Sequence, residues 1–204
     1  MRKYIELFFL YVLAPLILLV EIHYGFKIIY FLLGFIYVAY ITIKEEKIEW
    51  KIEWRLKTRG LLVPLIIRFF FILITTFLFI HFFEGEKLFN VITNKPSLWA
   101  WFSLVYIGLS VIPQEFLYRT LFFSRYKQLF SNKWVFFAVN CVLFSFAHIW
   151  LQSYVVLLFT FVGGIFYFLT YNHTRSLLFV CIEHAVYGLW LFTVGFGELF
   201  NFPV

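Results

Sequence analysis

Residues 61–83 read LLVPLIIRFFFILITTFLFIHFF, and Arg68 is the only Lys, Arg, Asp or Glu among them. A bilayer core of about 30 Å is crossed by roughly 20 apolar residues in a helix, which bonds all its backbone polar groups internally. The stretch therefore predicts a membrane-spanning helix. The whole chain resembles it in composition, with 63% hydrophobic and 14% charged residues, and this composition excludes a soluble domain.

Apolar runs of similar length recur along the chain, so we expect an all-α, polytopic transmembrane bundle of about seven spans, with six or eight also compatible with the pattern. The first run follows Arg2 and Lys3 as in a signal peptide, but no small-x-small cleavage site follows it, so we interpret it as a retained anchor. The predicted spans are residues 5–20, 26–43, 61–83, 99–123, 134–150, 154–171 and 176–196.

Lys and Arg residues gather on one side of these spans, the side that also holds the N-terminus and the polar stretch 44–60. Cytoplasmic loops carry an excess of Lys and Arg, so the pattern predicts an integral protein of the cell membrane with a cytoplasmic N-terminus. The net charge of +6 then reflects loops beside the anionic lipid bilayer. No nucleic-acid partner is expected, because the basic residues do not share one soluble module.

The polar stretch 44–60 repeats Lys-Ile-Glu-Trp at 47–50 and 51–54. Its apolar residues recur every four positions, which predicts a short amphipathic helix at the cytoplasmic interface. We expect residues 1–60 to form an N-terminal transmembrane hairpin with this interfacial loop, and residues 61–204 to form a helical core. No linker rich in Pro or Ser divides them, so the two parts belong to one membrane domain.

Four ionisable side chains inside the predicted spans form the candidate site: Glu115, Arg119, His148 and His184. Such groups cost several kcal/mol in hydrocarbon unless they pair or line a polar cavity, so they are functional candidates. At about 1.5 Å per residue, Glu115, His148 and His184 lie about 12–21 Å from the cytoplasmic ends of their spans. We expect these three to meet near the middle of the membrane, with Arg119 pairing with Glu115 four residues earlier.

Two further features predict packing contacts. Arg68 lies deep in its span and needs a partner, for which Glu183 is the candidate. Thr160 and Gly164, with Gly163 beside the latter, give a small-xxx-small spacing that lets two helices approach closely.

Three segments of this core also resemble a known family. They read PQEFLYR at 113–119, FSFAH at 144–148 and EHAVYG at 183–188. In this order they are similar to the motifs Glu-Glu-xxx-Arg, Phe-xxx-His and His-xxx-Asn/Asp of the CPBP (Abi) family, the CAAX proteases and bacteriocin-processing enzymes. The resemblance spans roughly residues 99–196 and implies a glutamic-type intramembrane protease acting on a membrane-anchored protein or peptide.

The sequence departs from the family motifs at two positions. Gln114 stands in place of the first Glu, and a Gln side chain cannot hold a proton as a base does, so the carboxylate base must be Glu115. Gly188 stands in place of the Asn or Asp, which removes a side-chain donor that the family would use to stabilise an oxyanion. Asn140 or Tyr187 are the replacements that the sequence suggests.

The expected chemistry is hydrolysis of a peptide bond by an activated water. Glu115, held by Arg119 and assisted by His148, would accept the proton, and His184 would donate a hydrogen bond to the oxyanion. Glu115, His148 and His184 also make a two-histidine, one-carboxylate set that zinc could occupy. We favour a site without a cofactor, because no HExxH spacing supplies two ligands from one helix.

Two other classes of function remain open. The polar residues can serve only helix packing, which would make the chain a membrane scaffold or an immunity or regulatory protein. Alternatively, Glu and His side chains can relay protons in a transporter, although no inverted repeat is visible. The choice between a prenylated CaaX end, a leader peptide and a sorting tail as substrate is left open by the sequence.

Overall fold

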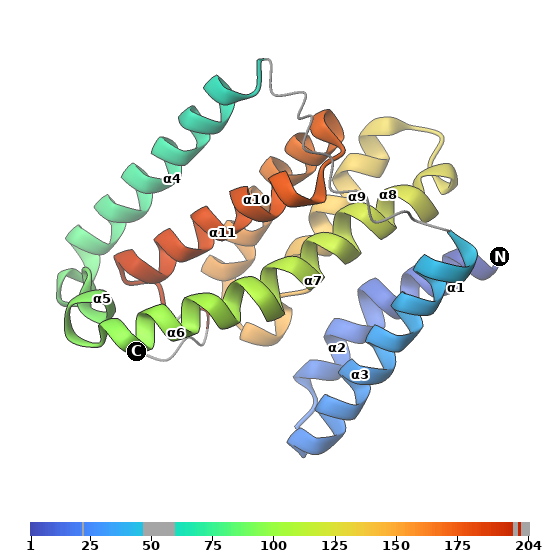
Figure 1. The fold of residues 1–204 in the computed structure, drawn as a ribbon, viewed down its shortest axis with the longest axis horizontal. Coiled ribbons are helices and arrows are strands. Elements are labelled where there is room, and N and C mark those ends of the chain that lie inside the picture. The colour runs from blue at the N-terminus through green and yellow to red at the C-terminus, as the bar shows by residue number, and fades with distance from the viewer. Residues whose placement is uncertain (22, 47–59, 198–199, 201–204) are drawn as a thin grey trace. The chain divides into compact units, whose positions relative to one another are not determined.

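The computed structural model describes residues 1–21, 23–46, 60–197 and 200. Every regular element in these ranges is helical (Figure 1), which confirms the predicted all-α class. The interfacial helix expected in residues 44–60 falls almost wholly outside the described residues and stays a prediction.

Six helices in the described residues are long and apolar enough to cross a membrane. The segment predicted as a span at 5–20 is part of a helical stretch from Arg2 to Leu19 that is not among the six. This stretch carries three charged residues near its start, Arg2, Lys3 and Glu6. The number of spans is therefore at the lower end of the expected range. The six helices are Gly25–Glu45, Leu62–Phe83, Pro96–Arg125, Lys133–Leu151, Tyr154–Thr174 and Leu177–Val194.

The chain folds into two compact units. Unit 1 contains Met1–Ile52 and Phe116–Phe168, and unit 2 contains Glu53–Glu115 and Leu169–Val204. The expected division into residues 1–60 and 61–204 stays a prediction.

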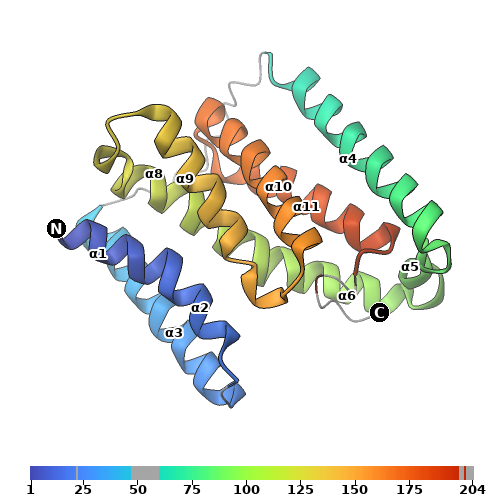
Figure 2. The same cartoon turned by 180° about the vertical axis from the view of Figure 1, so that it is seen from behind.

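Unit 1 begins with a helical hairpin in which α1 and α2 run antiparallel to α3 (Figures 1 and 2). A π-helical segment, Phe9–Leu13, joins α1 to α2, and another, Ile41–Glu45, extends α3. The helices of this unit are α1 (Arg2–Phe8), α2 (Ala14–Leu19), α3 (Tyr24–Tyr40), α8 (Phe122–Arg125), α9 (Lys133–Phe146) and α10 (Tyr154–Thr174), the last of which ends in unit 2.

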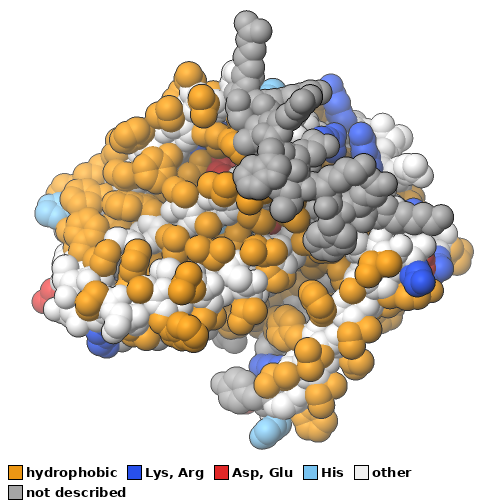
Figure 3. Space-filling model, in the orientation of Figure 1, with side chains coloured by type: hydrophobic (Ala, Val, Ile, Leu, Met, Phe, Trp, Pro, Cys, Tyr) orange, Lys and Arg blue, Asp and Glu red, His pale blue; other side chains and the backbone are white. Residues whose placement is uncertain are grey.

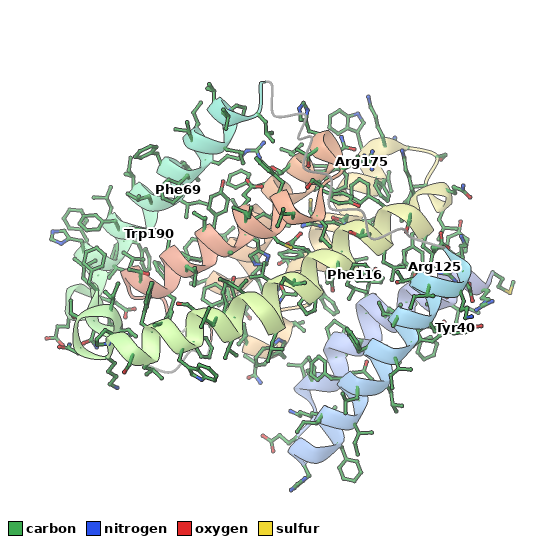
Figure 4. All side chains as sticks on the ribbon, in the orientation of Figure 1. Tyr40, Phe69, Phe116, Arg125, Arg175 and Trp190 are labelled. Atoms are coloured by element: carbon green, nitrogen blue, oxygen red, sulfur yellow. The ribbon has the colours of Figure 1, made fainter. Side chains whose placement is uncertain are left out.

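A buried guanidinium ties the hairpin to α8. Arg125 is 2% exposed (labelled in Figure 4), and its Nη2 lies 2.6 Å from Glu6 Oε2 and 2.8 Å from Glu45 Oε2. Its Nη1 lies 2.8 Å from Glu46 Oε1. Burial raises the pKa of Glu6, but hydrogen bonds from Arg125 and Tyr126 outweigh burial and hold that pKa below its ordinary value. Three carboxylates thus compensate one buried cation.

A π-helical segment, Phe116–Leu121, follows Glu115 in sequence, and side chains of unit 1 bond its carbonyls. Tyr11 Oη donates to the carbonyl of Leu117 at 2.8 Å, and Asn140 Nδ2 donates to that of Tyr118, also at 2.8 Å. A π turn breaks the regular i→i−4 pattern, and within a membrane the carbonyls it releases need other donors. The hairpin and α9 therefore both fix this segment.

Helices α9 and α10 approach closely at Gly164, as the small-xxx-small spacing predicts. A Cβ at this position would lie 3.2 Å from Phe144 Cδ1 and 3.4 Å from the carbonyl oxygen of Cys141. Ser145 Oγ also donates to the carbonyl of Leu157 at 2.7 Å, which is a polar link between the same two helices. Small residues make this contact possible because they let the backbones meet.

In unit 2, α11 lies against α4 and α6. The ring of Phe69 on α4 stacks on Tyr187 of α11, with centroids 6.4 Å apart, and Trp190 Nε1 donates to Thr76 Oγ1 at 2.9 Å (Figure 4). Pro96 begins α6 at its first position, where the missing N–H is harmless. The helices of this unit are α4 (Leu62–Phe83), α5 (Asn90–Asn94), α6 (Pro96–Tyr106), α7 (Ile112–Glu115) and α11 (Leu177–Val194).

The outward surface of these helices is largely apolar. Hydrophobic side chains make up most of the face shown in Figure 3. Phe35 of α3 is 66% exposed and Phe82 of α4 is 73% exposed, values that suit contact with lipid rather than water.

The hydrogen bond from Tyr11 to the π-helical segment predicts a stability effect. Tyr11 is 0% exposed, so Tyr11→Phe removes one donor and leaves the ring packing intact. We expect a loss of about 0.5–2 kcal/mol, seen as a lower thermal midpoint in detergent. Tyr154→Phe, at a side chain that is 91% exposed in the same unit, is the matched control. Equal midpoints for the two variants would contradict the assigned role of Tyr11.

Candidate active site

The first motif lies on a helix that runs without a break from Pro96 to Arg125. Pro113 lies inside this run, where a proline ordinarily kinks a helix or starts a new one, but the helix continues through it. A π-helical segment, Ile107–Val111, precedes α7, and a second one, Phe116–Leu121, follows it. Proline lacks an N–H and clashes with the carbonyl four residues earlier, and the wider π turn suits both conditions. Such turns are frequent at functional sites.

Glu115 and His184 meet in unit 2. His184 Nδ1 lies 2.7 Å from Glu115 Oε1, and the two residues are 6% and 0% exposed. One comes from the end of α7 and the other from the middle of α11, 69 residues later. An ionised carboxylate only accepts hydrogen bonds, so Nδ1 then carries the hydrogen. The structure thus brings together two of the three predicted catalytic residues as one hydrogen-bonded pair.

The surroundings of this pair are apolar. Val111, Cys181 and Ala185 form a buried cluster, against which Tyr106 packs. The Tyr106 ring also meets the His184 ring edge-on, with centroids 6.1 Å apart. A low local dielectric strengthens the hydrogen bond between Glu115 and His184 and disfavours leaving either group without a partner.

Gln114 is half-buried and donates from Nε2 to Ser110 Oγ at 2.8 Å, one turn back on the same helix. The amide of Gln114 therefore stabilises the helical segment around Pro113 by a side-chain hydrogen bond. The position where the family has a carboxylate is used here for a neutral hydrogen bond.

Arg119 belongs to unit 1, where it is 0% exposed. Its Nη1 donates to Asn140 Oδ1, its Nη2 donates to the carbonyl of Gly164 at 3.3 Å, and the guanidinium lies 4.9 Å from the centroid of the Phe144 ring. These contacts hold Arg119 against both α9 and α10. The predicted ion pair with Glu115 joins residues of different units and stays a prediction.

Asn140 is engaged at both ends of its amide. Its Oδ1 accepts from Arg119 and its Nδ2 donates to the carbonyl of Tyr118, and the residue is 0% exposed. This geometry supports a positioning role for Asn140 rather than contact with a substrate.

His148 lies just beyond the end of α9 and belongs to unit 1, whereas Glu115 and His184 belong to unit 2. Its Nδ1 lies 3.0 Å from the carbonyl oxygen of Phe144. A carbonyl only accepts, so Nδ1 carries the hydrogen and Nε2 is the acceptor of the neutral ring. Zinc binding would need His148 together with the pair in unit 2, and this metal hypothesis stays open to experiment.

Glu183 and Tyr187 form a second polar group on α11. Arg68 Nη1 lies 3.4 Å from Glu183 Oε1 and 3.1 Å from Thr170 Oγ1, which confirms the expected partner of Arg68. Tyr187 Oη donates to Glu183 Oε1 at 2.9 Å. The hydroxyl proposed from sequence as a replacement donor is therefore used within this group.

The space beside Gly188 contains a residue that the sequence analysis did not single out. A Cβ at Gly188 would overlap the Tyr106 hydroxyl, and the Cζ and Cε1 atoms of that ring would lie 2.5 and 2.7 Å away. Gly188 is buried and is four residues after His184 on α11. A glycine where the family has a larger side chain was the available signal that another residue fills this space.

Comparison with known proteins finds a similarity over this region. The family model for "Type II CAAX prenyl endopeptidase Rce1-like" matches residues 96–190, which include all three motifs. No match was found among curated proteins, and none among solved structures.

The Arg68–Glu183 pair predicts a coupled stability effect. Their side chains are 15% and 3% exposed, so Glu183→Ala removes a carboxylate that compensates a largely buried cation. We expect a loss of about 3 kcal/mol, measured as a lower thermal midpoint. Arg68→Met is measured alone and together with Glu183→Ala, and this double variant, which lacks both charges, should regain part of that loss.

Glu84→Ala is the control for this experiment, because the pair of Glu84 with Lys87 is exposed and should contribute at most about 1 kcal/mol. Strictly additive effects of the two substitutions at Arg68 and Glu183 would show that the pair is not coupled.

Proposed function

Residues 96–190 match the model of the Rce1-like type II CAAX prenyl endopeptidases, and from this similarity we propose that the protein is an intramembrane endopeptidase of the glutamic type. The observation that carries the proposal is the buried hydrogen bond between Glu115 and His184. It places a carboxylate and an imidazole, the groups needed for proton transfer and oxyanion stabilisation, on two helices of an integral membrane protein.

In the proposed reaction, a water molecule attacks the scissile carbonyl carbon while Glu115 accepts its proton. Because Oε1 is bonded to His184, the second oxygen, Oε2, is the assigned acceptor. The electron pair of the carbonyl π bond moves to the oxygen, which gives the oxyanion of the tetrahedral intermediate, and it re-forms the C=O bond in the next step. When the C–N bond breaks, Glu115 returns the proton to the leaving nitrogen, and the carboxylate is regenerated.

His184 has two tasks in this scheme. Its Nδ1 orients Glu115, and its Nε2 donates to the oxyanion when the ring is protonated. His148, whose neutral ring accepts at Nε2, assists by orienting the water. Arg119 supplies a fixed positive charge on the same helix run as Glu115, held by its contacts with Asn140 and Gly164.

The proposed substrate is a membrane-anchored protein or peptide, whose scissile bond reaches the site from within or beside the bilayer. The name of the matched family points to prenylated CaaX ends as the first class to test. Leader peptides and sorting tails are the comparison classes.

The role of Glu115 is tested by exchanging charge at two adjacent residues. We expect Glu115→Gln to lower the cleavage rate by at least the roughly 10²–10⁴-fold that a general base contributes. Gln114→Glu should keep or increase activity, because Glu115 remains in place. The measurement is cleavage of a fluorogenic prenylated peptide by purified protein in detergent.

Both variants must be shown to be folded, by extraction yield and melting, before their rates are compared. A folded Glu115→Gln protein that still cleaves would make Glu115 a structural partner of His184 and would favour the scaffold function. If the wild type cleaves no peptide but moves protons across vesicles, the transporter function would replace the proposal.

Metal dependence is tested separately. In the absence of a metal cofactor, incubation with EDTA and gel filtration should leave the rate unchanged, and elemental analysis should find zinc well below one atom per chain. Loss of activity that Zn²⁺ restores would assign Glu115, His148 and His184 as ligands instead.

A further inference from the structure

Tyr106 occupies the volume that a side chain at position 188 would need. The overlap involves three atoms of Tyr106, namely Oη, Cζ and Cε1, so it covers the polar end of the side chain and not only its edge. Any residue larger than glycine at 188 would displace this ring. Gly188 and Tyr106 therefore act as a matched pair.

The hydroxyl of Tyr106 is placed beside the catalytic pair by two observations. Gly188 is one helical turn after His184 on α11, so both positions share one face of the helix. The ring of Tyr106 meets the ring of His184 edge-on, with centroids 6.1 Å apart. Tyr106 comes from α6, immediately before the π-helical segment Ile107–Val111 that leads to Glu115.

We propose that Tyr106 is an oxyanion donor of this protease, with its hydroxyl in the space left by Gly188. The inference rests on the proposed function. The phenolic O–H can donate one hydrogen bond, as the N–H of an amide side chain at position 188 would. The hydroxyl keeps its proton throughout, and it stabilises the negative charge that develops on the carbonyl oxygen together with Nε2 of His184.

The two donors suggested by the sequence, Tyr187 and Asn140, have other partners. Tyr187 Oη is bonded to Glu183, and Asn140 is bonded to Arg119 and to the backbone of Tyr118. Tyr106 is half-buried and packs against the apolar cluster around Val111, which fixes the position of its ring. A fixed donor in an apolar setting is the arrangement that stabilises an oxyanion most effectively.

The first test removes only the hydroxyl. Tyr106→Phe should lower kcat by about 10²–10³-fold with little change in KM, because the bond forms in the transition state and not with the bound substrate. Tyr171→Phe, at a buried tyrosine of the same unit, is the matched control and should keep the wild-type rate. A Tyr106→Phe protein with the wild-type kcat would overturn the inference.

The second test exchanges the two residues. Gly188→Asn alone should lower both the thermal midpoint and the rate, because the new side chain overlaps Tyr106. Tyr106→Ala alone should lower the rate. The double variant should recover the midpoint relative to Gly188→Asn and should be at least about tenfold faster than either single variant, since an amide donor then fills the same space.

Glu115→Gln, assayed beside these variants, separates the two proposals. If the wild type cleaves, Glu115→Gln does not, and Tyr106→Phe cleaves normally, Tyr106 only fills space and the proposed function stands. If Glu115→Gln cleaves as the wild type does, the proposed function fails and the oxyanion role fails with it. A double variant whose midpoint and rate are no better than those of the single variants would contradict the shared space itself.

Discussion

A polar group placed inside a membrane needs a partner from the protein, and this constraint shapes both units. Water is absent from the hydrocarbon region, so buried charges and the carbonyls of irregular segments need bonds to other elements of the protein. Arg125 meets three carboxylates in unit 1, and Arg68 meets Glu183 and Thr170 in unit 2. Glu115 and His184 follow the same rule, because each is the hydrogen-bond partner of the other, and this pair is the proposed centre of catalysis.

The π-helical segments show how the same constraint fixes geometry. Regular helices need no outside donors, whereas the segment Phe116–Leu121 takes donors from Tyr11 and Asn140. Each such bond joins the motif-bearing helix to another helix of unit 1. The carbonyls released by the π turn next to Glu115 therefore make tertiary hydrogen bonds, and these bonds hold the segment in one conformation.

The features that follow from the cost of burying polar groups and from helical spacing could be predicted from the sequence. They include six of the membrane spans, the partner of Arg68, the close approach of helices at Gly164 and the contact of Glu115 with His184. These depend on one residue type at one depth or on a fixed helical period, so the chain reveals them directly.

The features that could not be predicted from the sequence depend on the joint packing of residues that are distant in the chain. Pro113 suggests a break in the helix, but the observed adjustment is π-helical on either side of α7. The contact of Tyr106 with Gly188 joins residues 82 positions apart, and only the packed positions of α6 and α11 bring them together. The first helix carries charges that pair with Arg125 and Glu45, which composition alone cannot place.

The central claim is that this protein itself hydrolyses a peptide bond with water activated at Glu115. The most direct measurement is mass spectrometry of the products formed by purified protein from a membrane-anchored peptide in ¹⁸O-labelled water. Under the proposed mechanism, one ¹⁸O atom enters the new C-terminal carboxylate of the product, and folded Glu115→Gln protein forms no labelled product. A folded wild-type protein that yields no labelled product, or equal label from both proteins, would contradict the account.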